Sequence, residues 1–331
     1  MKKTFQGVPF SILELALVNE GSDESAALQH SLEFAKRADE LGYYRFWLAE
    51  HHNMPGVASS ATSILIGYIA GGTKRIRVGS GGVMLPNHAP LIIAEQFGTL
   101  EALYPNRIDL GIGRAPGTDQ ATAFALRRSL EGAESFPESL KELRTYFEHN
   151  ENKLVRAYPG DGLHVPVWLL GSSDFSARLA ADLGLPFSFA SHFAPQYLDA
   201  ALMLYRENFK PSTALQNPNA MVAVNIIAAE TDEEADYLAY SLKQKFLHLA
   251  QGISAKFQPP KKDTFTPYEE ALFSRSLNPL TTIIGSKETI ERKLTTLIEQ
   301  TKADEIIISS SIYDPVARIR SLEIIADLFD N

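Results

Sequence analysis

Apolar runs alternate along the chain with segments whose apolar residues recur at helical spacing. Residues 10–18 form a strand-like apolar run, and Ser22 can then cap a helix that ends at Gly42. The same succession recurs along the whole chain. Further expected strands are 44–49, 76–85, 108–112, 165–170, 187–190, 221–229 and 305–309, followed by expected helices at 62–70, 91–103, from about 119, 173–183, 196–209, 233–250 and 316–328.

About eight strand–helix repeats predict a parallel sheet with helical crossovers. Eight units in 331 residues fit an α/β fold of the (β/α)8 TIM barrel type, with 1–331 as a single domain. A doubly wound sheet is the competing architecture. The glycine-rich turn 111–117 argues against it, because it follows the fourth strand and is one residue too long for a dinucleotide fingerprint.

Two segments, which we call excursions, break the strand–helix alternation and predict insertions after strands 4 and 7. The first covers about 131–166 and contains a helix-like stretch at 137–147. The second covers about 252–279, with Pro259 and Pro260 and little periodicity. A long segment of this kind in a compact domain is typical of a lid or binding loop, so we expect 252–279 to be a mobile lid over the barrel mouth.

Composition and charge exclude several classes of protein. The chain is 45% hydrophobic and 21% charged and has no apolar run near 18 residues, so no membrane span is expected. Its 31 basic and 40 acidic residues give a net charge of −9, which disfavours nucleic acid as a partner. The absence of cysteine excludes disulfides, thiolate metal sites and cysteine nucleophiles. The first residues lack the apolar core of a secretory signal, so we expect a cytoplasmic protein.

The second expected strand ends in Glu50, His51 and His52. Catalytic groups of TIM barrels gather where strands end. Adjacent strand residues point to opposite faces, so the two histidines cannot both hold one metal ion from a regular strand. Structural, acid/base and metal roles all stay open for these residues.

The third strand carries Gly79, Gly81 and Gly82. Glycine weakens a buried strand, so three of them indicate a β-bulge or a flat ligand lying close against the backbone.

The fourth and fifth strands end in groups that suit an anion. Arg114 follows the fourth strand, and Ser172, Ser173 and Ser176 surround the start of the next helix. A helix N-terminus with hydroxyl groups binds anions, and an arginine suits phosphate or carboxylate. A surface salt bridge and a plain helix cap are the alternative interpretations. Because the two strands are neighbours in a barrel, these residues together favour a phosphate site.

Five motifs resemble the bacterial luciferase-like flavin monooxygenases, and in particular their single-chain bacterial branch. They occupy 46–52, 79–88, 107–114, 171–173 and 184–186, in order along nearly the whole chain. The resemblance implies a barrel that binds FMN, in the reduced form supplied by a separate NAD(P)H-dependent flavin reductase. It also implies an enzyme that uses O2 to oxygenate a small organic substrate.

The resemblance also implies roles for particular residues. Arg114, Ser172, Ser173 and Ser176 match phosphate contacts. Ser80, Gly81 and Gly82 match the segment beside the flavin ring, with a cis peptide bond between the two glycines. His51 matches the histidine associated with catalysis, and Glu50 is its neighbour in the cavity. No metal is implied.

Three other functions stay open. The same barrel serves F420-dependent oxidoreductases and flavin-binding proteins without turnover. A metal-dependent hydrolase would need more inward-facing ligands, for which His192 and Asp314 are the evident candidates.

Two expected outer helices are apolar nearly all round, at 64–71 and 91–100. A barrel helix needs only one apolar face. We therefore expect a symmetric homodimer through these helices, with Gly67, Ala70 and Gly71 allowing close approach of the partner.

Overall fold

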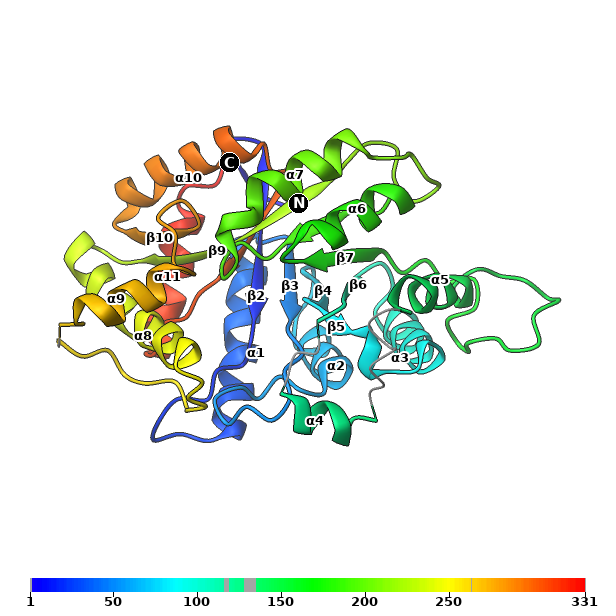
Figure 1. Cartoon of the computed structure of the whole chain (residues 1–331), viewed down its shortest axis with the longest axis horizontal. Coiled ribbons are helices and arrows are strands. Elements are labelled where there is room, and N and C mark those ends of the chain that lie inside the picture. Colours follow the sequence, from blue (N-terminus) through cyan, green and yellow to red (C-terminus); the bar gives the residue numbers. More distant parts are fainter. Residues whose placement is uncertain (1, 116–118, 128–134, 263, 331) are drawn as a thin grey trace.

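Eight parallel strands close into a barrel in the computed structural model, which describes residues 2–115, 119–127, 135–262 and 264–330 (Figure 1). Each strand pairs with the next along the chain, and the last pairs with the first. The prediction of a TIM barrel is confirmed. The barrel strands are β2 (Val8–Glu14), β3 (Arg45–Leu48), β4 (Arg77–Ser80), β6 (Ile108–Gly113), β7 (Val167–Gly171), β8 (Phe187–Phe189), β9 (Ala220–Ala228) and β11 (Glu305–Ser309).

Three short strands extend this barrel. β1 (Thr4–Phe5) pairs with β2, β5 (Val83–Met84) continues along β6, and β10 (Thr282–Gly285) pairs with the second half of β9. The sequence did not predict β10 as a strand, because four residues give too short an apolar run to distinguish from a loop.

Helices surround the barrel strands (Figure 1). Two short 3-10 turns, Leu85–Asn87 and Pro195–Tyr197, accompany them. The helices are α1 (Glu24–Leu41), α2 (Thr62–Gly72), α3 (Pro90–Leu103), α4 (Gln120–Ala125), α5 (Phe136–Tyr146), α6 (Asp174–Leu183), α7 (Leu198–Glu207), α8 (Asp232–Ala250), α9 (Pro267–Ser274), α10 (Lys287–Thr301) and α11 (Pro315–Ala326). Among the described residues, none of these helices is long and apolar enough to cross a membrane.

The ends of α1 show why the chain folds locally as it does. Asp23, rather than the expected Ser22, caps the helix, and its carboxylate accepts a hydrogen bond from the Ala26 amide at 2.8 Å. Gly42 ends the helix in the left-handed conformation, with φ of 94°, and donates to the Ala38 carbonyl.

A buried ionic network fills the end of the barrel where the strands begin. Arg45 donates to Asp109 at 2.7 Å and to Glu305 at 3.0 Å. Arg77 also binds Asp109 at 2.7 Å, and the Trp47 indole donates to the same carboxylate. Burial raises the pKa of Asp109, but the two guanidinium groups outweigh it and leave that pKa lowered. Side chains thus occupy this end of the barrel, which leaves the opposite mouth for a ligand.

The second excursion, 252–279, lies within a longer connection between β9 and β11 that contains α8, α9, β10 and α10. Despite its low periodicity, this segment is anchored by apolar packing. Phe257 and Phe273 are buried, and Phe265 stacks on Tyr240 with ring centroids 4.6 Å apart. Backbone hydrogen bonds also join Phe257 to Val18 and Glu20 at 2.8 Å. Closure of this segment as a lid stays a prediction.

The first excursion is described only from residue 135 onward, because 131–134 lie outside the described residues. Its helix, α5, matches the expected helix-like stretch.

Candidate active site

The residues predicted as a site lie around one mouth of the barrel, where the parallel strands end. Glu50 and His51 follow β3, Gly81 and Gly82 follow β4, Arg114 follows β6, and Ser172 and Ser173 follow β7. Because β3, β4, β6 and β7 are successive neighbours in the barrel, these groups occupy one side of the mouth.

Glu50 is the centre of a hydrogen-bonded cluster. Its side chain is 2% exposed, and its carboxylate lies 2.9 Å from the Nε2 atoms of both His52 and His88. The Met84 amide donates to the same carboxylate at 3.1 Å, and the Asn87 side chain donates at 3.3 Å. The cluster therefore joins the loop after β3 to the segment after β5.

The electrostatics of this cluster favour an ionised carboxylate. Burial raises the pKa of Glu50, but hydrogen bonds from His88, His52 and the Met84 amide outweigh it and leave the pKa lowered. Glu50 is thus a fixed negative charge that orients two imidazoles. His88 and Asn87 were not predicted as site residues, although both follow the glycine-rich strand; their contacts with the buried Glu50 carboxylate place them in the site.

His51 lies in the same region as His192 and Lys245. Burial, with smaller contributions from the charges of Lys245 and His51, lowers the pKa of His192 to about 3. His192 is therefore neutral at neutral pH, and its Nδ1 is buried without a hydrogen-bond partner among the described residues. The mouth thus holds a neutral imidazole beside His51.

The glycine segment after β4 contains a β-bulge. Gly79 pairs with Asp109 and Val83 pairs with Ile112, so three residues face two on β6. The peptide bond between Gly81 and Gly82 is cis, as the resemblance implies. A Cβ on Gly81 would lie 2.6 Å from Leu13, and one on Gly82 would lie 2.8 Å from the Gly111 carbonyl. The close approach of neighbouring strands therefore accounts for these glycines.

Ser80 is also fixed by this packing. It is fully buried, and its hydroxyl donates to the Gly111 carbonyl at 2.8 Å.

Arg114 lies at the start of α6. Its guanidinium carbon is 3.9 Å from the centroid of Phe175, which is in the first turn of that helix. Ser173 is the N-cap residue and makes no side-chain cap hydrogen bond among the described residues, while Ser176 is buried one turn further on. The structure therefore brings together the arginine, the serines and the positive end of a helix, an arrangement suited to an anion.

The barrel mouth opens into a cavity of about 380 Å³ between the loops after β2 and β3 and the C-terminal part of α8. We call it the mouth cavity. The residues that line it are Leu17, His52, Asn53, Met54, Gly56, Val57, Asp119, Lys245, His248, Leu249, Gly252, Ile253, Ser254, Ala255, Lys256, Phe257 and Gln258.

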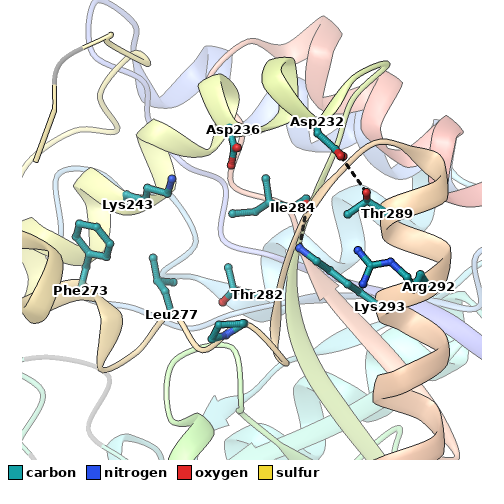
Figure 2. A pocket seen from close by; sticks show the side chains of 11 residues that line it. Asp232, Asp236, Lys243, Phe273, Leu277, Thr282, Ile284, Thr289, Arg292 and Lys293 are labelled. Carbon is teal, nitrogen blue, oxygen red and sulfur yellow. Dashed lines mark hydrogen bonds between the residues drawn. The ribbon is translucent and has the colours of Figure 1, made fainter.

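A second cavity of about 410 Å³ lies between α8, α9, β10 and α10 (Figure 2). Several of its polar groups bind one another or the backbone: Asp232 accepts from Thr289 at 3.1 Å, and Lys293 donates to the Ile284 carbonyl at 3.1 Å. None of the predicted site residues is among those lining it. None of them lines the mouth cavity either, but His52, which binds Glu50 at 2.9 Å, does line it, so the mouth cavity is the better candidate for chemistry.

The model of one protein family, luciferase-like monooxygenase, matches residues 8–305. The chain belongs to this family. It is 50% identical over 330 residues to the "Luciferase-like monooxygenase" of Escherichia coli K12, covering 98% of each chain. It is 55% identical over 326 residues to the protein YvbT of Bacillus subtilis, covering 97% of this chain and 96% of the relative. It is 33% identical over 335 residues to the N-acetyl-S-alkylcysteine monooxygenase of B. subtilis, covering 97% and 98% of the two chains.

Among solved structures, apo-MsnO8 has a TM-score of 0.86 and 36% identity and covers 97% of this chain and 98% of its own. More distant structures share the fold. The oxygenating constituent of 3,6-diketocamphane monooxygenase, in complex with FMN, has a TM-score of 0.71, 19% identity and 96% coverage of both chains. An F420-dependent secondary alcohol dehydrogenase has a TM-score of 0.71, 14% identity and full coverage. The family thus supports a monooxygenase, while the fold accommodates both kinds of flavin.

Asp314 serves as the cap of α11 and accepts from the Ala317 amide at 2.8 Å. This role, together with family membership, removes the support for a metal-dependent hydrolase.

Proposed function

We propose that this protein is an FMN-dependent monooxygenase that uses reduced FMN and O2 to oxygenate a small organic substrate. The observation that carries the proposal is the meeting of Arg114 with the N-terminus of α6 at the barrel mouth. A small-molecule substrate and O2 are the implied reactants. A separate flavin reductase is the implied electron source, and a cytoplasmic location would provide its NAD(P)H.

The residues present fit a flavin phosphate. A phosphate carries a charge of about −2, and a chain with a net charge of −9 needs local positive groups to bind it. Arg114 and the first amides of α6 supply them, and the hydroxyls of Ser172, Ser173 and Ser176 are further donors. Gly81 and Gly82 follow β4 at the same mouth and would lie beside the ring.

When bound, the reduced flavin would supply the reaction with O2. The chain's own residues would then orient the substrate, exclude water and manage protons. His51 is our choice for the group that moves a proton, because a histidine titrates near neutral pH. Glu50 would keep the neighbouring imidazoles of His52 and His88 in place.

An F420-dependent oxidoreductase is the second candidate, favoured only by fold-level likeness. The longer anionic tail of that cofactor calls for more basic residues, whereas Arg114 is the basic residue that we find at the start of α6. A flavin-binding protein without turnover is the third, and the ordered cluster around Glu50 argues for chemistry instead.

The experiment that tests the proposal is titration of the purified protein with FMN and with F420, followed by absorbance. We expect saturable binding of FMN and weaker or no binding of F420. The reduced FMN complex is then mixed with O2. Flavin oxidation that differs in rate from that of free reduced FMN would support the monooxygenase. Tight binding with unchanged oxidation, whatever substrate is added, would favour the binding protein.

We further propose a homodimer through α2 and α3. Large apolar side chains lie exposed on these two helices, with Ile64 at 71% and Leu103 at 64%. Of the small residues expected at the interface, Ala70 is buried and packs within the subunit instead. For Gly67, which is partly exposed, and Gly71, which is exposed, close approach of a partner stays a prediction.

Analytical ultracentrifugation at micromolar concentration tests this interface. We expect a dimer for the wild type and a monomer for Ile64→Asp, because a charge in an apolar interface is not compensated. Val316→Asp is the matched control: Val316 is 77% exposed on α11, so this variant should stay dimeric. A monomeric wild type would overturn the proposal.

A further inference from the structure

The mouth cavity is mostly apolar but carries more positive than negative groups. Leu17, Met54, Val57, Leu249 and Ile253 contribute apolar surface, and two lysines, Lys245 and Lys256, line it together with two histidines. Its volume of about 380 Å³ is within the range of about 300–1,000 Å³ that small-molecule sites occupy. A ligand of this cavity therefore needs an apolar body.

The carboxylate that lines the cavity, Asp119, is already held by other groups. It accepts hydrogen bonds from the Asn53 side chain at 2.9 Å and from the Thr122 amide at 2.8 Å, at the N-terminus of α4. These contacts lower its pKa. Asp119 is therefore an ionised helix cap, and among the described residues it forms no ion pair with either lysine.

Lys245 lies on α8 and lines the mouth cavity. Its ammonium makes one long hydrogen bond with the described residues, to the Ser311 hydroxyl at 3.4 Å. No carboxylate among the described residues lies within 4.0 Å of it. An ammonium can donate three hydrogen bonds, and a charge withdrawn from water is costly unless it is paired.

Glu14, the acidic group whose charge raises the pKa of Lys245, is already bonded to other groups. Glu14, at the end of β2, accepts from Arg318 at 2.5 Å, from the Ala16 amide at 2.6 Å and from Ser31 at 3.0 Å. Burial and the charge of Arg318, partly offset by Glu14, lower the pKa of Lys245 to about 8. Lys245 thus stays largely charged at neutral pH.

Resting on the proposed function, we propose that the substrate is an organic carboxylate whose apolar part fills the mouth cavity and whose carboxylate binds Lys245. The contact would replace the missing anionic partner of this ammonium. His248 and Lys256 line the same cavity and would add to its attraction for anions. Lys256 is itself anchored, since it donates to the Ser22 carbonyl at 2.7 Å.

The test measures binding of octanoate and of its neutral analogue octanamide to the purified full chain by isothermal titration calorimetry at pH 7. We expect octanoate to bind the wild type at least tenfold more tightly than octanamide. Lys245→Met should remove this preference by weakening octanoate at least tenfold while leaving octanamide within about twofold. Lys245→Arg should retain most of the preference, because it keeps the charge.

The matched control is Lys243→Met. Lys243 lies two residues earlier on α8 but lines the other cavity (Figure 2). It should bind octanoate as the wild type does. Equal affinity for octanoate and octanamide in the wild type, or equal losses in the two methionine variants, would overturn the proposal.

FMN titration of the same proteins shows whether Lys245 contacts a substrate carboxylate or the proposed FMN cofactor. Lys245→Met should bind FMN within about twofold of the wild type. A large loss of FMN affinity would mean that Lys245 serves the flavin, which overturns the carboxylate contact. A protein that binds octanoate but not FMN would contradict the proposed function, and with it the role of the carboxylate as substrate, while still supporting a carboxylate-binding site at Lys245.

Discussion

Replacing Arg114 by Ala should weaken FMN binding by about 2–4 kcal/mol, or roughly 30- to 1,000-fold, while leaving riboflavin affinity almost unchanged. The guanidinium lies over the Phe175 ring at the N-terminus of α6, where a phosphate would meet both a full positive charge and the helix dipole. Riboflavin lacks the phosphate, so its affinity should not depend on Arg114. Fluorescence titration of both flavins measures the difference.

A control arginine is available on the same helix. Arg178 is 57% exposed on its side chain and lies 3.6 Å from Asp174, one turn away. Arg178→Ala should bind FMN as the wild type does, because an exposed ion pair contributes little. Arg114→Lys should recover only part of the affinity, since it restores the charge without the forked geometry of guanidinium. Equal losses of FMN and riboflavin in Arg114→Ala would show that Arg114 does not meet the phosphate.

The barrel could be predicted from sequence because its strands are locally readable. β2 and β9 are buried along their whole length, so their apolar runs stand out without polar alternation. Glycine and acidic caps mark the ends of α1 in the same local way. β10 and the buried phenylalanines of 252–279 were missed, because their burial depends on contacts with distant elements rather than on a repeating local pattern.

The site residues also divide into those that could be predicted from sequence and those that depend on distant contacts. Arg114 and the serines could be placed together from strand order alone, since β6 and β7 are neighbours in any barrel of this order. The partners of Glu50 could not, because His88 reaches it from the segment after β5 only through the turn at Leu85–Asn87. Lys245 was missed for a further reason: α8 carries it to Ser311, a contact between elements far apart in the sequence.

His51→Ala should leave FMN binding within about 1 kcal/mol of the wild type, because the phosphate contacts lie elsewhere in the mouth, at α6. Coupled oxygenation should nevertheless fall by about 10²-fold or more, the usual order for the loss of an acid/base group. His192 cannot take over as a proton donor at neutral pH, since its pKa of about 3 keeps it neutral.

The measurement is rapid mixing of the reduced FMN complex with O2 and a panel of candidate substrates, among them an N-acetyl-S-alkylcysteine, the class named for one relative. Product formed per flavin oxidised is compared with hydrogen peroxide released. In His51→Ala we expect the product to fall while peroxide rises, because oxidation of the flavin continues without transfer to the substrate. His30→Ala, at an exposed position of α1, is the control and should behave as the wild type. Unchanged product yield in His51→Ala would remove His51 from the mechanism and direct attention to the imidazoles that Glu50 holds, His52 and His88.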